Sequence, residues 1–108
     1  MIGINNLTRT KVNKSFLEKI AKNVLKGKKI ELSIALVGPK RIKELNKKYR
    51  KKNQVTDVLT FPYDDSGEVI ICLSKIKKNA KKFSLTFNKE LTRVLTHGIK
   101  NLWRDNLS

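Results

Sequence analysis

Apolar residues along this chain recur at two different spacings, and these spacings predict its secondary structure. Between residues 30 and 37, apolar and polar side chains alternate, which is the period of a β-strand with one buried face. Between residues 15 and 25, apolar side chains return every three or four positions, which predicts an amphipathic helix. Ser15 followed three residues later by Glu18 matches a capping box at its start, and Gly27 suits its exit.

Two short apolar runs in the middle of the chain predict a β-hairpin. Residues 58–61 are mostly β-branched or aromatic and end at Pro62, and residues 69–73 form a continuous apolar run. The segment between them, Tyr63-Asp64-Asp65-Ser66-Gly67, is rich in residues that favour turns. We therefore expect two paired strands joined by a loop of about five residues.

Three further helices and one further strand complete the prediction. A second helix is expected over residues 39–49, Ser74 can cap a third, and a fourth begins near Thr86. Residues 2–6 are expected to form a short first strand. The predicted order is therefore β-α-β-α-β-β-α-α. It describes one α+β domain over residues 1–108, with a small mixed sheet of about four strands packed with four helices.

The charge balance of the chain is strongly basic. Lys and Arg number 25 against nine Asp and Glu, and the formal net charge is +16. A polyanion such as RNA is the partner that this charge indicates. Lysine, however, supplies 20 of the 25 basic residues, and Asn and Ile are also abundant. A- and T-rich codons favour these three residues, so mutational bias can produce this composition without selection for binding. Charge by itself therefore leaves RNA binding and mutational bias equally open.

Simple counts exclude or disfavour several classes of protein. The longest uncharged apolar run is Val69–Leu73, far short of the roughly 20 residues that a membrane-spanning helix needs. Cys72 is the only cysteine, so the chain can form no intrachain disulfide and no cysteine-rich zinc module. The first residues lack the pattern of a secretory signal. We expect a cytoplasmic protein with no membrane or disulfide partner, in which Cys72 packs inertly in the core.

Four stretches of the sequence together carry a family resemblance. They are Leu45-Asn46-Lys47-Lys48-Tyr49-Arg50, Thr56-Asp57-Val58-Leu59-Thr60-Phe61-Pro62, Gly67-Glu68-Val69-Ile70-Ile71, and Glu90-Leu91 followed by Thr96-His97-Gly98-Ile99. In this order and at this spacing the chain resembles the YbeY family, the bacterial metal-dependent endoribonucleases linked to rRNA maturation. The resemblance implies a hydrolase that cuts single-stranded RNA and whose partner is an rRNA precursor or the ribosomal small subunit.

The resemblance also implies a zinc site, and there the sequence departs from the family. The family pattern His-Gly-x-x-His-Leu-x-Gly-Tyr-Asp-His binds one zinc through three histidines. This chain has His97 at the first position and Asn101 at the second, and the third falls on Asn106 or Leu107, depending on a gap. A zinc site needs three good ligands, and an amide oxygen is a poor substitute for imidazole. Zinc is the cofactor that the family implies, but we expect this chain to bind it weakly or not at all.

Three explanations of the divergent end of the chain, about residues 100–108, are open. The gene is truncated or frameshifted, the protein is a non-catalytic relative, or the chain uses a different and weaker metal site. The functional hypotheses follow from them. The first is a YbeY-type endoribonuclease, the second is a basic RNA- or ribosome-binding relative that has lost the zinc site, and the third is a fragment without function.

Arg50 is the candidate catalytic residue that the resemblance implies. A guanidinium can clamp a phosphate with two hydrogen bonds and stabilise charge that develops on it. Asp57 is interpreted as a turn or cap residue that bonds backbone N–H groups. The helix that begins near Thr86 is expected to turn His97 towards the strand at residues 56–61 and towards Arg50. Four lysines flank Arg50 and would add RNA phosphate contacts, although a solvated helix end also explains them: Lys47, Lys48, Lys51 and Lys52.

Overall fold

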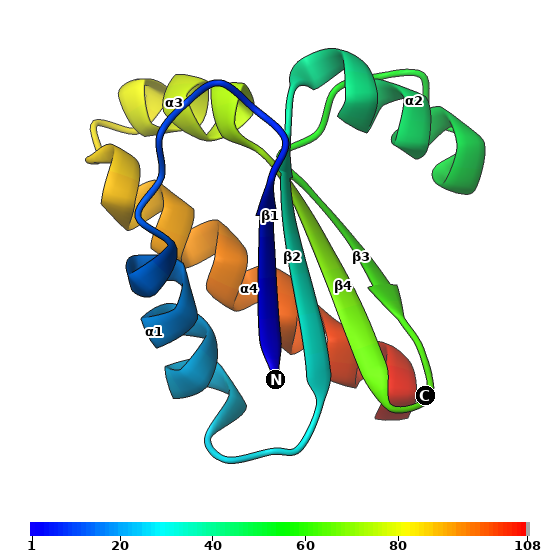
Figure 1. Cartoon of the computed structure of the whole chain (residues 1–108). Coiled ribbons are helices and arrows are strands. Elements are labelled where there is room, and N and C mark those ends of the chain that lie inside the picture. Colours follow the sequence, from blue (N-terminus) through cyan, green and yellow to red (C-terminus); the bar gives the residue numbers. More distant parts are fainter. Residues whose placement is uncertain (108) are drawn as a thin grey trace.

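The computed structural model of the chain describes residues 1–107, and the side chains of residues 1–102. Its elements follow one another in the order that the sequence predicts, and the α+β fold is confirmed (Figure 1). The elements are β1 (Ile2–Asn6), α1 (Lys14–Leu25), β2 (Glu31–Val37), α2 (Pro39–Arg50), β3 (Val58–Pro62), β4 (Ser66–Cys72), α3 (Leu73–Lys82) and α4 (Phe87–Leu107).

The strands form one mixed sheet with the spatial order β1-β2-β4-β3. β1 pairs with β2, and β2 with β4, in parallel, whereas β3 and β4 are antiparallel. The predicted hairpin is present, but its loop is shorter than expected because Ser66 and Gly67 belong to β4. The backbone N–H of Tyr63 donates to the carbonyl of Ser66 at 2.9 Å and closes the turn. This pairing leaves β3 at one edge of the sheet.

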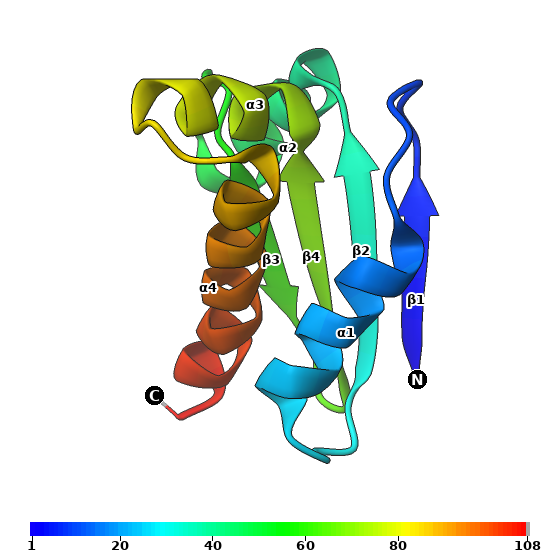
Figure 2. The ribbon, with the colours of Figure 1, turned by 90° about the vertical axis from the view of Figure 1, so that its left-hand side faces the viewer.

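Helices α1, α3 and α4 cover one face of the sheet (Figure 1, Figure 2). The alternation along β2 sends Leu32, Ile34 and Leu36 to this face, and all three are buried, as the sequence predicts. Each fully buried aliphatic side chain of this kind contributes roughly 1.5–3 kcal/mol to folding. The layer therefore holds α4 firmly against the strands through its buried stripe, which consists of Leu91, Val94, Leu95, Ile99 and Leu102.

Helix α2 packs against the opposite face of the sheet and covers only part of it (Figure 1). Its residue Ile42 belongs to a second, smaller apolar cluster, made with strand residues that alternate with those of the first. Cys72 is completely buried in this cluster, so its expected role as a packing residue is confirmed. The other buried members are Val37, Leu59 and Ile70.

The starts of two helices differ from the sequence prediction. Helix α1 is capped by Asn13, whose side-chain oxygen accepts a hydrogen bond from the N–H of Phe16 at 3.2 Å, so Ser15 is not its cap. Helix α3 begins at Leu73, and Ser74 lies inside the helix rather than capping it. Asn and Ser are comparably good caps, so local sequence does not choose between them.

Other helix boundaries agree with the prediction. Gly27 follows α1 with a φ of 79°, a left-handed conformation that glycine adopts without strain. The hydroxyl of Thr86 accepts a hydrogen bond from the N–H of Lys89 at 3.1 Å and caps α4. Over residues 1–107, none of the helices is long and apolar enough to cross a membrane.

Candidate functional site

Helix α4 packs closely against the sheet at Gly98, next to His97 in the sequence. A Cβ atom at Gly98 would lie 3.1 Å from Val69 Cγ1 and 3.2 Å from Val58 Cγ2. Both neighbours are β-branched strand residues with little rotameric freedom, so a larger side chain would have to displace the helix or the strands. The glycine thus allows α4 to lie directly on β3 and β4, and it sets the position of His97 relative to them.

His97 is exposed, and Asn101, one turn further along α4, is half buried. Their i, i+4 spacing places them on the same side of the helix. The side chains of Asn106 and Leu107, the two candidates for the third ligand, lie outside the described residues.

These residues do not fit a three-ligand zinc site. Among residues 1–102, no three His, Cys, Asp or Glu side chains are grouped so that they could hold a metal ion. The whole sequence contains one histidine, and the neighbouring Asn101 offers a neutral amide instead of an imidazole. Structural and catalytic zinc sites are built from at least three Cys, His, Asp or Glu ligands.

A half-buried ion pair lies on α4, and the sequence analysis did not predict it. Glu90 is completely buried, and both of its carboxylate oxygens accept hydrogen bonds from Arg93. The distances are 2.8 Å from Arg93 Nε and 2.7 Å from Arg93 Nη2. The i, i+3 spacing of the two residues could have suggested the pair. Nothing in the sequence marks this particular glutamate as buried.

The pair shifts the pKa values of both of its members. The hydrogen bond from Arg93 holds the pKa of Glu90 below its usual value, although burial acts in the opposite direction. The hydrogen bond to Glu90 likewise raises the pKa of Arg93, and the charge of Asp57 contributes to that rise. Arg93 therefore interacts with acidic groups on α4 and on the loop that leads into β3.

Within the described part of the chain, the side chain of Asp57 accepts no hydrogen bond from a backbone N–H, so the cap that the sequence interpretation expected is not found there. Its contribution to the backbone is its carbonyl, which accepts a hydrogen bond from the N–H of Cys72 at 3.0 Å. Its carboxylate interacts with the charge of Arg93 instead. The sequence interpretation missed this role because Arg93 lies 36 positions further along the chain.

Arg50 is the last residue of α2 and is exposed, like the four lysines that flank it. The helix stops there because Lys51 adopts a left-handed φ of 58° and its N–H donates to carbonyls of the last turn. The preceding Tyr49 packs edge-on against Phe61 of β3, with ring centroids 5.2 Å apart and an angle of 70° between the rings. This contact anchors the end of α2, and with it Arg50, to the edge strand.

The segment that follows Arg50 is also held in place. Asn46, a buried residue of α2, donates a hydrogen bond from its side-chain amide to the carbonyl of Gln54 at 3.0 Å. The N–H of Lys52 donates to the carbonyl of Asn46 at 3.3 Å. The loop that carries Lys51 and Lys52 is therefore fastened to α2 at both ends.

Strand β3 separates the two main candidate groups. Helix α4, with His97, packs on one face of the sheet, and α2, with Arg50, packs on the other. Among the described side chains, no hydrogen bond or ion pair joins His97 to Arg50. Both helices nevertheless contact the same edge strand, α4 through Gly98 beside Val58 and α2 through Tyr49. Both candidate groups therefore lie on elements that contact the edge strand β3.

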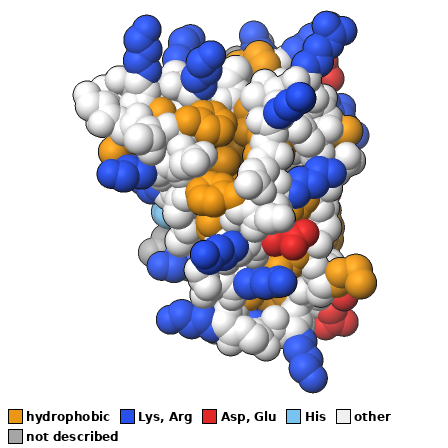
Figure 3. All heavy atoms as spheres, turned by 60° about the vertical axis from the view of Figure 1, so that its left-hand side comes forward, with side chains coloured by type: hydrophobic (Ala, Val, Ile, Leu, Met, Phe, Trp, Pro, Cys, Tyr) orange, Lys and Arg blue, Asp and Glu red, His pale blue; other side chains and the backbone are white. Residues whose placement is uncertain are grey.

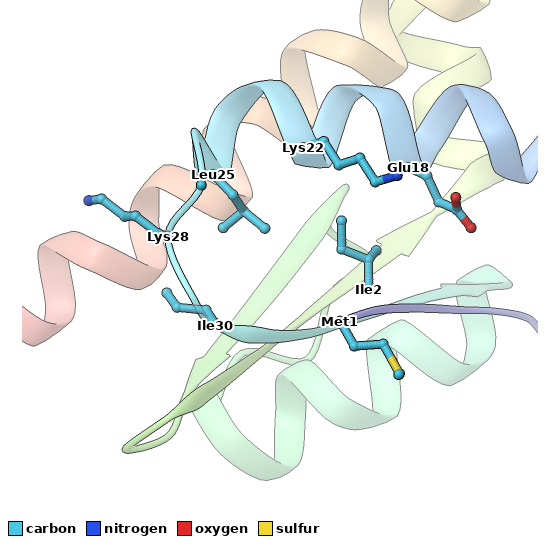
Figure 4. Close-up of a pocket in the computed structure, with 8 residues that line it drawn as sticks. Met1, Ile2, Glu18, Lys22, Leu25, Lys28 and Ile30 are labelled. Carbon is cyan, nitrogen blue, oxygen red and sulfur yellow. The ribbon is translucent and has the colours of Figure 1, made fainter.

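A separate hollow of about 430 Å³ lies between α1, β1 and the loop before β2 (Figure 4). Its apolar lining includes Ile2, Leu25 and Ile30, and Lys22 and Glu18 also line it. None of the candidate site residues takes part in it. This hollow is therefore not the site that the sequence analysis predicted.

Comparison with known proteins gives consistent matches. A family profile described as Endoribonuclease YbeY matches residues 3–102. A protein named Endoribonuclease YbeY from Thermodesulfovibrio yellowstonii is 41% identical over 89% of this chain and 69% of its own length. One of the same name from Thermosipho melanesiensis is 39% identical over 75% of this chain, which spans only 60% of that relative.

A solved structure agrees with these relatives. A solution structure of a Thermotoga maritima protein superposes on this chain with a TM-score of 0.70 and 34% sequence identity. The match covers 94% of this chain and 71% of the other. The family profile spans the segment that carries Arg50 and helix α4, with His97, as far as residue 102. The chain therefore belongs to the YbeY family of endoribonucleases.

Proposed function

We propose that this chain acts as a single-strand-specific, metal-dependent endoribonuclease in rRNA processing and ribosome maturation. The observation that carries the proposal is the family match, which spans the motif ending in Arg50 and the helix of His97. The net charge of +16 is consistent with an RNA substrate. The RNA would be an rRNA precursor or part of the ribosomal small subunit, and the protein would work in the cytoplasm.

Arg50 is proposed to hold the phosphate at the cleavage site. Its guanidinium is exposed, it ends an anchored helix, and no acidic side chain forms an ion pair with it among the described residues. A guanidinium in this state can make two hydrogen bonds to a phosphate and stabilise charge during cleavage. Lys47, Lys48, Lys51 and Lys52 would bind neighbouring phosphates without reading the sequence.

A single strand suits Arg50 and His97 because the helices that carry them both contact the edge strand β3. An unpaired RNA strand is flexible enough to follow the edge of a sheet, whereas a rigid duplex is not. Tyr49 is 56% exposed and lies next to Arg50, where its ring could stack on a base. The proposed substrate path therefore runs from the end of α2 around β3 towards α4.

His97 is proposed as one metal ligand, as its place in the family motif indicates. The metal of the family would supply a Lewis acid and an activated water when bound. Because the described residues do not fit a zinc site, no step of the reaction is assigned to the metal in this chain. A second candidate function follows from the single histidine: a basic RNA- or ribosome-binding relative that does not cleave.

Two measurements on the purified chain separate the candidates. The zinc content per chain is measured together with cleavage of an unstructured RNA. About one zinc per chain with cleavage supports the nuclease, and RNA binding with neither zinc nor cleavage supports the second candidate. Arg50→Ala should lower cleavage by roughly 10²-fold, the order found when one electrostatic contact to a transition state is removed. Arg41→Ala is the matched control, because Arg41 is an exposed arginine on the same helix. Equal effects of both substitutions would remove Arg50 from the site.

A further inference from the structure

A second basic surface lies on α3, apart from the segment that carries Arg50. From residue 69 to residue 89 the sequence contains six lysines and no acidic residue. The apolar side of α3 is buried through Leu73, Ile76 and Ala80. Helical spacing therefore places three lysines on the opposite side, Lys77, Lys78 and Lys81. Their side chains are exposed, and within residues 1–102 none of them forms an ion pair. Lys and Arg side chains crowd the end of the molecule where α3 lies (Figure 3).

These lysines border a hollow of about 410 Å³ between α3 and the start of α2. Its volume falls within the roughly 300–1,000 Å³ that is typical of ligand sites. Apolar atoms of Pro39 and Val55 form part of its lining. The hollow thus combines positive charge with apolar surface. A nucleotide matches both, because its phosphate is negatively charged and the face of its base can pack on apolar atoms. Its other lining residues are Ser74, Lys75, Lys77, Lys78 and Lys81.

The hollow connects to the proposed RNA path through the loop after α2. Val55 follows Arg50 by five positions, so their Cα atoms are at most about 18 Å apart. Lys51 and Lys52 lie on the connecting loop. Residues 51–55 contain no acidic side chain, so a strand held at Arg50 could continue past these two lysines to α3.

We propose that the hollow beside α3 binds the sugar-phosphate backbone of the RNA strand that continues from Arg50. The proposal rests on the proposed function for the identity of the ligand as RNA. Lysine ammonium groups contact phosphates as point charges, so this surface contributes affinity and direction rather than sequence preference. It extends the RNA contact from the edge of β3 to the end of the molecule formed by α2 and α3.

The test compares two triple variants with the same loss of charge. Lys77→Gln, Lys78→Gln and Lys81→Gln remove the α3 lysines, and Lys14→Gln, Lys19→Gln and Lys22→Gln remove three exposed lysines of α1 as the control. Binding of a labelled, unstructured RNA of roughly 16 nucleotides is followed by fluorescence anisotropy between about 50 and 200 mM salt. Melting temperatures of both variants are measured, and the single variant Lys78→Gln replaces the triple if that does not fold.

The α3 variant should lower the slope of log affinity against log salt by about 2, since each phosphate contact of a single strand contributes roughly 0.7. The α1 variant should change this slope by less than about 0.7. Lys78→Gln alone should lower it by roughly 0.7. Equal slopes for the two triple variants would overturn the proposal. It would also be overturned if the α3 substitutions weakened binding to anionic lipid vesicles but left RNA binding unchanged. If the native chain binds RNA through α3 but does not cleave it, the nuclease function fails and the binding surface stands.

Discussion

Replacing Arg93 with Gln should destabilise the fold by leaving a carboxylate buried without its partner. Glu90 has no solvent exposure, and both of its oxygens accept hydrogen bonds from Arg93. Breaking a buried ion pair by removing one partner costs about 3–5 kcal/mol. The side chain of Arg93 is 55% exposed, however, so water already weakens the interaction from that side. We therefore expect Arg93→Gln to lower the free energy of unfolding by about 2–3 kcal/mol at pH 7.

The same substitution should reverse the way in which Glu90 links stability to pH. In the native chain the pKa of Glu90 lies below its usual value of 4.5, chiefly because of the Arg93 hydrogen bond. Glu90 therefore stabilises the fold above about pH 4.5, and this contribution is lost as the pH falls through the lower folded pKa. In Arg93→Gln only burial remains, which raises the pKa of Glu90. Lowering the pH from 7 towards 5 should then reduce the destabilisation, because the buried group takes up a proton.

Urea unfolding at pH 7 and at pH 5 measures both effects. Arg41→Gln is the control, because it removes an ion pair of the same i, i+3 spacing that is exposed on both sides, with 3.8 Å between Arg41 and Glu44. It should cost less than about 0.5 kcal/mol. Adding Glu90→Gln to Arg93→Gln should recover part of the loss, since no buried charge remains. The reasoning is refuted if Arg93→Gln costs no more than Arg41→Gln, or if its cost does not shrink at pH 5.

Three further predictions concern the site and its supports. Asn101→His restores the i, i+4 imidazole pair with His97. Two ligands rarely hold zinc against water, so calorimetry should show only weak zinc binding by this variant. Tight binding should need a third histidine at position 106 or 107. Tight zinc binding by the unmodified chain would refute this prediction, because it would show that other ligands complete the site, and it would favour the nuclease over the second candidate. Tyr49→Ala removes the ring contact with Phe61 and should weaken RNA binding in an anisotropy assay, whereas Tyr49→Phe should not. Asn46→Ala removes the side-chain hydrogen bond that holds the following loop and should lower the free energy of unfolding by about 1–3 kcal/mol, as followed by urea unfolding.

Periodicity determined the elements of this protein. The alternation at residues 30–37 predicted β2 because one face of that strand is buried, and the structure buries Leu32, Ile34 and Leu36 there. The apolar stripe that begins after Thr86 predicted α4 for the same reason. The family motifs likewise point to Arg50 and His97 from the sequence alone. Each of these inferences depends on residues that lie close together in the chain.

Other features depend on contacts between distant segments, and only the tertiary structure decided them. Glu90 is buried in the folded chain, although glutamate is otherwise among the most exposed residues. The interaction of Asp57 with Arg93 depends on how α4 packs against the segment before β3, which lies 36 positions away in the chain. Whether α2 and α4 cover the same face of the sheet or opposite faces is also a long-range choice. The helices that carry Arg50 and His97 cover opposite faces and both contact β3, and burial of two separate apolar clusters holds them there.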